Sequence, residues 1–398
     1  MTLSEFLRGI RVIDVSQFIP GPQAALHLAD MGAEVVKVEP PGGEPMRGLG
    51  PFDADGLSAG YKLMNRGKTV VELDLKSPQG KEAFSALIAA ADVLVESYRP
   101  GVLDRLGFDR ATLERLNSRL VHVALTGFGQ TGPYRLRAGH DINYMALAGG
   151  LASSGTAERP VGAYPPTADH ASALQAALAA VAALFRRVST GRGCFVDVSL
   201  AETVLAWQAI PLTLAQRAGH EPHRTHQRLN GGAANYQIYR CKDGKFFSLG
   251  AVEEKFWAGF CRAVGRPGWI ARHGDPLPQT ALIAEVAALI ASEPLAHWER
   301  LIEPADCCFH PVIDLAEVPS HPQIAARGLV HRATEDPPLV ETLFPAWVDG
   351  APPAPREPLR FAAAEAVVAR GGSRLSRKAT TRKTSSGPST SPSSLPPT

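Results

Sequence analysis

The sequence predicts an α/β protein with an open, mostly parallel β-sheet, accompanied by a smaller α+β domain. In the N-terminal half, short runs rich in β-branched residues alternate with stretches whose apolar residues recur at helical spacing. From about residue 229 this alternation gives way to a hairpin pattern and further helices. The chain has 398 residues, of which 45% are hydrophobic and 20% charged, typical of a soluble globular protein of two or three domains.

The alternation predicts five strands with helices between them. The strands are expected at 10–16, 34–40, 68–75, 92–98 and 120–129. The helices between them are expected at 20–33, 77–91 and 111–117. Ligands bind beyond the carboxyl ends of the strands in such sheets, so the loops that follow these strands are the first places to look for a site.

The rest of the chain divides into a helical middle and a smaller domain. Further helices are expected at 141–150, 170–188, 199–217, 253–264, 279–292 and 295–302, with a strand at 191–199. A hairpin is expected at 236–251, where Asp243 and Gly244 form a typical two-residue turn. We therefore expect a large domain at 1–224, completed by 331–365, and a small domain at 225–330. The polar segment 371–398 is expected to be disordered.

Charge and cysteine content narrow the function classes. The net charge is +2, and the segment 371–398 carries five basic residues and no acid, so removing these five leaves −3 for the rest. This balance predicts neither a nucleic-acid nor a membrane partner. Five cysteines without a C-x-x-C spacing predict no disulfide framework and no zinc site. The first residues do not resemble a signal peptide, so we expect a cytoplasmic protein. Because the histidines and cysteines lack a metal-ligand spacing, we expect no resident metal.

Four acidic or imidazole groups are expected at the starts of three helices. His140 and Asp141 precede one apolar helix, Asp169 precedes the next, and Glu253 lies between a strand and a helix. Helix capping explains each carboxylate, because it can accept the free amide hydrogens of the first turn or favour the positive helix end. His140 would then be an ordinary loop residue. Chemistry at these positions is the alternative interpretation.

Two further features suggest a phosphorylated ligand. The loop 39–51, EPPGGEPMRGLGP, is rich in glycine, but it matches neither the dinucleotide fingerprint nor the P-loop. A NAD-dependent dehydrogenase is therefore poorly supported. Lys76, Arg99 and Arg105 follow predicted strands, where cations suit a phosphate, although each alone is equally an ordinary surface residue.

Taken together, the segments resemble a known family. The segments that carry the resemblance are IPGPQAALHLADMGAEVVKVEPPGGEP, NRGKTVVELDLKSPQGKEAF, ADVLVESYRPGVLDRLG, GFGQTGPYRLRAGHDINYMALAGG and STGRGCFVDVSLAETV. They resemble, in order and spacing over about residues 6–330, the class III CoA-transferase family of the CaiB/BaiF type. Within it the chain is most similar to the alpha-methylacyl-CoA racemase branch. The resemblance implies a Rossmann-like large domain and an obligate homodimer of interlocked rings.

The resemblance also implies catalytic roles. Asp169 matches the aspartate shared by the family, which is a nucleophile toward the acyl-CoA thioester in transferases and a proton carrier in racemases. His140 and Glu253 match the histidine and glutamate that work with it in racemases. On this basis we expect a 2-methylacyl-CoA racemase that acts through an enolate, with a CoA-transferase as the alternative. A non-catalytic CoA-ester binding paralogue is the third possibility.

By matching positions, the resemblance further implies the residues that contact CoA, the only cofactor expected, as part of the substrate. These are Lys37, Leu73, Asp74, Leu75, Lys76, Ser97, Tyr98, Arg99, Arg105, Gly139, His140, Asp141, Ile142, Asn143 and Tyr144. The chain departs from the racemases at three places: Pro40 replaces an arginine, His170 lies where the racemase pattern is glycine-rich, and the loop 231–236 reads GGAANY. These changes surround the expected ligand, so they bear on the substrate and the reaction type.

Overall fold

The computed structural model describes residues 1–218, 223–334 and 338–370, and the predicted disordered segment 371–398 lies outside them. The chain forms two compact units. Of the described residues, unit 1 comprises 1–137, 169–199 and those of 331–370, and unit 2 comprises 138–168 and those of 200–330. The segments 138–168 and 200–224, expected in the large domain, thus group with the small one.

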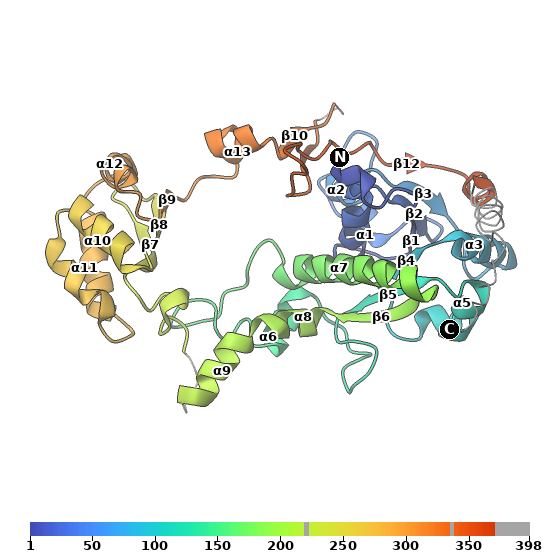
Figure 1. The fold of residues 1–398 in the computed structure, drawn as a ribbon, viewed down its shortest axis with the longest axis horizontal. Helices are drawn as coiled ribbons and strands as arrows, with labels where there is room; N and C mark the ends of the chain where they lie inside the picture. The colour runs from blue at the N-terminus through green and yellow to red at the C-terminus, as the bar shows by residue number, and fades with distance from the viewer. Residues whose placement is uncertain (219–222, 335–337, 371–398) are drawn as a thin grey trace, which may run out of the picture. The chain divides into compact units, whose positions relative to one another are not determined.

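Unit 1 is built on a seven-stranded sheet in which every pair of neighbours is parallel. The strand order is β12-β3-β2-β1-β4-β5-β6 (Figure 1). The strands are β1 (Arg11–Asp14), β2 (Glu34–Glu39), β3 (Thr69–Glu72), β4 (Val93–Glu96), β5 (Val121–Thr126), β6 (Cys194–Ser199) and β12 (Arg360–Phe361). Without β12 this is the 3-2-1-4-5-6 order of dinucleotide-binding folds. The predicted parallel α/β sheet is confirmed.

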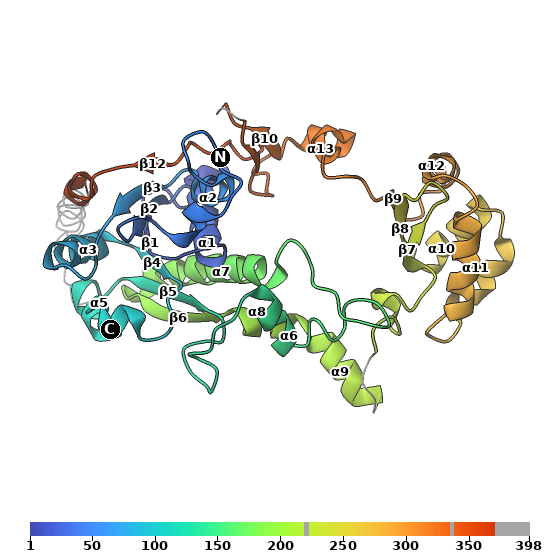
Figure 2. The ribbon, with the colours of Figure 1, turned by 180° about the vertical axis from the view of Figure 1, so that it is seen from behind.

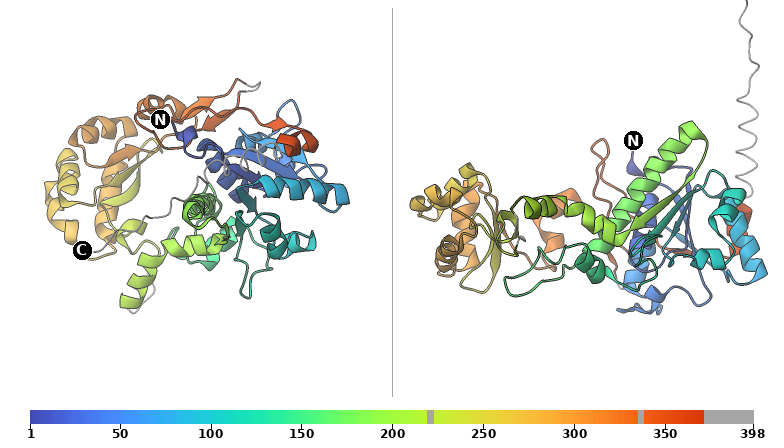
Figure 3. Two further views of the ribbon diagram at one scale, coloured as in Figure 1. Left: turned by 45° about the vertical axis from the view of Figure 1, so that its right-hand side comes forward. Right: turned by 90° about the horizontal axis from the view of Figure 1, so that it is seen from below.

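Helices cover both faces of this sheet, which is why its strands are apolar at successive positions. The helices of unit 1 are α1 (Pro20–Asp30), α2 (Ala59–Asn65), α3 (Pro78–Ala90), α4 (Val102–Arg105), α5 (Arg110–Leu116) and α7 (Thr167–Thr190). Phe84 and Leu87 of α3 pack with Ile13, Val36 and Leu94 on one face. The alternate residues of the same strands are also buried, and α7 runs alongside the strands (Figure 3).

Unit 2 contains a three-stranded antiparallel sheet flanked by helices (Figure 2). Its strands are β7 (Tyr236–Arg240), β8 (Phe246–Gly250) and β9 (Phe309–Pro311). Its helices are α6 (Asp141–Leu147), α8 (Leu200–Trp207), α9 (Ala209–Ala218), α10 (Glu254–Ala263), α11 (Thr280–Ile290), α12 (Leu295–Ile302) and α13 (Pro322–Arg327). Trp257, Phe260 and Trp298 lie in its apolar core. Two short strands, β10 (Val330–Arg332) and β11 (Val340–Thr342), pair where the chain returns to unit 1.

Several details differ from the sequence prediction, and two of them have a clear physical reason. The helix expected at 199–217 is two helices that divide at Gln208. Pro211 accounts for the break, because proline lacks an amide hydrogen and its ring clashes with the carbonyl four residues earlier, that of Trp207. Strand β12 was not predicted, since two residues carry no periodicity and only the pairing with β3 makes them a strand.

Helix α7 is longer than predicted and strongly apolar. By length and composition it meets the criteria for a membrane span, and half of its most apolar window is buried inside the protein. The core helix of a globular protein meets the same criteria. Leu174, Leu178, Phe185 and Val188 of this helix are exposed by 53% to 83%, so one side of α7 packs inside the chain and another does not.

His27 on α1 predicts acid sensitivity of the fold. Both ring nitrogens are buried without a hydrogen-bond partner, and the ring meets Phe344 edge-on at 5.6 Å. Burial, reinforced by the positive charge of Arg356, lowers the pKa of His27 to about 4. The unfolded chain binds this proton at about pH 6.5, so as the pH falls from about 6.5 to 4 the native state loses up to about 3 kcal/mol of stability.

We expect His27→Phe to make the acid limb of the stability curve shallower. Urea unfolding between pH 4 and 8 measures this, with His310→Gln on the exposed side of β9 as the control. An unchanged pH dependence in His27→Phe contradicts the assignment.

Candidate active site

The strand order reverses between β1 and β4, and this switch point is where open α/β sheets bind ligands. The loops that follow the two strands are joined there, because the amide of Gln17 donates to Oγ of Ser97 at 2.9 Å. Ser97 belongs to the predicted CoA phosphate loop. The switch point therefore lies at the part of unit 1 where the sequence places the ligand's phosphates.

Four charged groups are buried directly beneath the switch point. Nζ of Lys68 donates to Oδ2 of Asp14 at 2.9 Å, and Asp14 also accepts from the hydroxyl of Ser16. Nζ of Lys37 lies 3.3 Å from Oε1 of Glu44 and 4.0 Å from Oδ2 of Asp14. Asp14, Lys37 and Lys68 are fully buried, and Glu44 nearly so. We call Asp14, Lys37, Glu44 and Lys68 the buried charge network.

Mutual attraction keeps Asp14 and Lys68 of this network ionised, whereas burial raises the pKa of Glu44 against the opposing charge of Lys37. Burial alone would raise the pKa of Asp14, but the ammonium groups of Lys37 and Lys68 outweigh it and lower the pKa to about 2. Burial, opposed by Asp14 and assisted by Lys37, lowers the pKa of Lys68 to about 8. At neutral pH the Asp14 carboxylate and the Lys68 ammonium are therefore charged, and each depends on its oppositely charged neighbours for stabilisation.

The network defines the surroundings of Lys37, which the sequence predicts as a CoA contact. Besides Glu44, its ammonium donates to the carbonyl of Ser16 at 2.8 Å. A phosphate would reach this ammonium only if the loop after β1 moved, so its present geometry serves to hold that loop. Contact between Lys37 and CoA stays a prediction.

The sequence interpretation missed Asp14, Glu44 and Lys68 as parts of the site region. A signal existed for Asp14, an acidic residue at the end of an otherwise apolar strand. Glu44 lies in the glycine-rich loop 39–51, which folds back so that Glu44 also accepts from the amide of Phe18 at 2.9 Å. The Glu44 carboxylate thus fastens this loop to the loop after β1, which is a role beyond that of the glycines.

The residues predicted at the adenine and ribose follow strand β3. Leu73 and Leu75 are buried in the sheet core, whereas Asp74 and Lys76 are exposed. The carboxylate of Asp74 accepts from the amide of Lys76 at 2.9 Å, and Ser77 caps helix α3. Side chains of the two leucines face away from solvent, so a ligand here would meet the backbone and the two charged side chains.

The predicted phosphate loop follows strand β4. Oε2 of Glu96 accepts from the amide of Tyr98 at 2.7 Å, which fixes the turn out of the strand. Burial, reinforced by Glu96, raises the pKa of Tyr98 to about 12, so this phenol is neutral at physiological pH. Arg99 and Arg105 are exposed. Two exposed guanidinium groups beside a switch point are a suitable arrangement for a pyrophosphate.

In unit 2, the segment Gly139–Tyr144 forms the start of α6. His140, not Asp141, is the N-cap residue, and its amide donates to Oδ1 of Asn143 at 3.0 Å. The expectation that Asp141 caps its own helix is therefore wrong. His140, Ile142 and Asn143 are exposed, whereas Tyr144 is buried and its hydroxyl donates to the carbonyl of Gly139 at 2.5 Å.

Asp141 instead serves the start of another helix. Its Oδ1 accepts from the amide of Ala168 at 2.6 Å, and Ala168 is the second residue of α7. Asp169 follows it in the first helical turn and is partly exposed, so Asp169 is not the N-cap that the capping alternative required. One hydrogen bond thus joins the residue after His140 to the residue before Asp169.

Glu253 occupies the N-cap of α10 without a side-chain capping bond and is exposed. Burial and the nearby Glu253 charge raise the pKa of the Cys308 thiol, so the two side chains lie within electrostatic range.

The GGAANY loop precedes β7 and is held by the amide of Gly232, which donates to the carbonyl of Gln227 at 2.8 Å. The catalytic roles of His140, Asp169 and Glu253 stay predictions.

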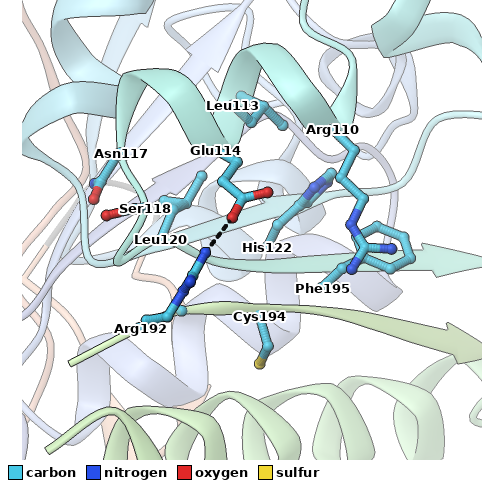
Figure 4. A pocket seen from close by; sticks show the side chains of 11 residues that line it. Arg110, Leu113, Glu114, Asn117, Ser118, Leu120, His122, Arg192, Cys194 and Phe195 are labelled. Carbon is cyan, nitrogen blue, oxygen red and sulfur yellow. Dashed lines mark hydrogen bonds and ion pairs between the residues drawn. The ribbon is translucent and has the colours of Figure 1, made fainter. Parts of the chain in front are cut away.

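A small pocket of about 100 Å³ lies at the opposite, amino end of strands β5 and β6 (Figure 4). Its charged side chains already have partners within the protein. Arg192 forms an ion pair with Glu114 at 2.7 Å, and the guanidinium of Arg110 lies over the ring of Phe195. The described residues that line it include none of the predicted site residues.

Within the described ranges, no group of three or more His, Cys, Asp or Glu side chains is arranged to hold a metal ion.

Comparison with known proteins identifies the family. Residues 7–359 match CoA-transferase family III, and the chain belongs to this family. It is 34% identical to human alpha-methylacyl-CoA racemase, over 81% of each chain. It is 31% identical to acetyl-CoA:oxalate CoA-transferase of Acetobacter aceti, over 81% of this chain and 84% of that protein. A crystal structure of a CaiB/BaiF family protein from Brucella suis superposes with a TM-score of 0.78 at 26% identity, covering 93% of this chain and 98% of that one.

Membership shows that the chain is an acyl-CoA enzyme of the racemase and CoA-transferase family. It confirms the family resemblance seen in the sequence. Since relatives of both reaction types match at similar identity, the reaction itself must be argued from the chain's own residues.

The bond between Asp141 and Ala168 predicts a stability effect. Asp141→Ala leaves the buried amide of Ala168 without its acceptor, which we expect to lower the free energy of unfolding by about 1–3 kcal/mol. Asp141→Asn keeps an acceptor oxygen, so it should lose clearly less. Urea denaturation monitored by circular dichroism compares the two, and equal stability of Asp141→Ala and the wild type contradicts the bond.

Proposed function

We propose that this protein is a 2-methylacyl-CoA racemase in which His140 and Asp169 exchange the α-proton. The observation that carries the proposal is the hydrogen bond from the amide of Ala168 to Asp141, which ties the segment bearing His140 to the start of the helix bearing Asp169. The 34% identity to a racemase over four-fifths of the chain supports it.

The reaction requires two bases on opposite faces of one carbon. One base takes the α-proton of the thioester, and the electron pair of the broken C–H bond moves into an enolate. The conjugate acid of the other base then delivers a proton to the opposite face, which restores the thioester with inverted configuration. An imidazole and a carboxylate, one at the start of α6 and one at the start of α7, supply the two bases.

Neighbouring groups favour this chemistry. Asp169 lies in the first turn of a 24-residue helix, where the positive end of the helix stabilises negative charge. Amide hydrogens at such a helix end also stabilise a developing enolate oxygen. A carboxylate close to His140 would steady the imidazolium that forms, and we assign this role to Glu253.

The same proposal assigns the CoA moiety to the switch point. Arg99 and Arg105 bind its phosphates, the backbone around Leu73–Lys76 meets the adenine and ribose, and Gly139–Tyr144 follows the pantetheine. The exposure of both arginines and the anchoring of Ser97 and Tyr98 support this placement. Pro40 has no phosphate-binding side chain, so the arginines carry more of that interaction.

A CoA-transferase is the alternative. A relative of 31% identity over the same share of the chain is a CoA-transferase, and Asp169 is available as its nucleophile. In that reaction the carboxylate attacks the thioester and releases CoA, leaving a mixed anhydride. CoA then attacks the enzyme carbonyl, which frees the acyl acid and forms an aspartyl–CoA thioester. An acceptor carboxylate attacks this thioester, releasing CoA and forming a second anhydride, and CoA attacks the acceptor carbonyl, which yields the new acyl-CoA and regenerates Asp169. This route makes no use of an α-proton.

We further propose that the chain acts as a homodimer. The exposed residues Leu174, Leu178, Phe185 and Val188 follow helical spacing along α7, so they form one apolar stripe. A stripe of this kind is costly to leave in water, and a second copy of the chain would cover it. The interlocked arrangement implied by the family resemblance provides such a partner.

The reaction types are separated by incubating a 2-methylacyl-CoA in heavy water without an acceptor acid. We expect proton NMR to show loss of the α-proton signal together with appearance of the other epimer. Asp169→Ala should lose both by more than 100-fold, since a missing proton carrier costs about 10²–10⁴-fold. His140→Ala should lose exchange to a similar extent, while His321→Ala, which also changes a helix N-cap histidine, should not.

The other outcomes decide between the alternatives. Transfer of CoA to a carboxylic acid without α-proton exchange would establish the transferase. Binding of CoA esters with neither reaction would identify a non-catalytic paralogue. Full turnover in Asp169→Ala would refute both enzymatic readings.

The dimer is tested independently of activity. We expect light scattering after gel filtration to give twice the chain mass of 42.3 kDa. Leu178→Asp places a charge in the apolar stripe and should yield monomer or aggregate, whereas Glu114→Asp, an exposed change on α5, should not. A wild-type protein that is monomeric at micromolar concentration overturns the proposal.

A further inference from the structure

His170 links the first turn of α7 to helix α1. Its Nδ1 lies 2.6 Å from Oε1 of Gln23. An amide oxygen accepts but does not donate, so Nδ1 carries the proton and donates to it. His170 directly follows Asp169, and this bond therefore acts one residue away from the carboxylate that both candidate reactions need.

Gln23 belongs to a helix end that is itself fixed. The carbonyl of Pro22 accepts from Nζ of Lys68 at 2.7 Å, and that ammonium is part of the buried charge network. At Gly21 a Cβ atom would come within 2.2 Å of Ser16, so the helix start lies directly against the loop after β1. The acceptor of the His170 bond thus lies on a helix start that is held by Lys68 and packed against Ser16.

The remainder of α7 is held by different contacts. Small residues such as Ala173, Ala176 and Ala180 are buried along its body, and Arg187 near its end pairs with Asp92 at 3.0 Å. In the first turn, the hydrogen bond of His170 to Gln23 adds a directional constraint one residue after Asp169.

We propose that His170 is a positioning residue for Asp169, acting through its hydrogen bond to Gln23. The inference rests on the proposed function only in that Asp169 reacts, which is common to the racemase and the transferase. It gives a purpose to a residue at which this chain departs from the racemase pattern. The expected consequence is on kcat, since a reacting group displaced by about 1 Å can lose about 100-fold in rate.

Substitutions of His170 test the bond. We expect His170→Leu, which keeps the bulk and loses the donor, to lower kcat by about tenfold to a hundredfold while KM for the acyl-CoA changes less than about threefold. In His170→Asn the amide nitrogen can replace Nδ1, so most of the lost kcat should return. Wild-type kcat in His170→Leu, or equal loss in both variants, overturns the proposal.

The acceptor side provides the second test. Gln23→Leu should reproduce the kcat loss of His170→Leu, and the double variant should be no slower than either single one. Gln79→Leu, an exposed change in the first turn of α3, is the matched control. Additive losses in the double variant would show that the two residues act separately.

A spectroscopic measurement separates failure of this inference from failure of the proposed function. In protein labelled with ¹⁵N-histidine, the signal absent from His170→Asn belongs to His170, and we expect it to report a ring that carries a proton on Nδ1. Gln23→Leu should change that tautomer signal even if no reaction is found. A ring protonated at Nε2 in the wild type refutes the bond, whatever the enzyme catalyses.

Discussion

The buried charge network beneath the switch point is the interaction on which the rest of unit 1 depends. Asp14 ends β1, Lys37 lies in β2, Lys68 precedes β3, and Glu44 comes from the loop after β2. One set of charges therefore joins three strands and a loop. Removing a single member would leave an uncompensated buried charge, at a cost of about 3–5 kcal/mol.

The network transmits its rigidity to the site through backbone contacts. Lys37 holds the carbonyl of Ser16, Lys68 holds that of Pro22, and Gln17 is bound to Ser97 across the switch point. The loop expected to bind phosphates and the start of α1 are thereby fixed together. A ligand with several phosphates suits a rigid edge of this kind, because little order is lost on binding.

Both reactions of the family require the same thing of the structure, which is a fixed position for the reacting aspartate. Whether the aspartate attacks a carbonyl or exchanges a proton, its oxygen must lie at a defined distance from the thioester. The first turn of α7 receives contacts from two earlier segments of the chain: Asp141 binds the amide of Ala168, and His170 binds Gln23. What differs between the reactions is the second base, so under the proposed function His140 distinguishes the two reactions and the support of Asp169 does not.

The sequence by itself determined the parallel α/β class and the residues matching the family, because periodicity and motif spacing are local properties of the chain. The ligand-binding edge stays a prediction. Only the tertiary structure showed which helix start each carboxylate binds. Asp141 is the first residue of α6, but its carboxylate accepts from the amide of Ala168 at the start of α7. The tertiary structure also decided that Lys37 is enclosed by Asp14 and Glu44, and that His170 meets Gln23, 147 residues away. These pairings join segments far apart in the chain, and burial sets their strength, so no local pattern encodes them.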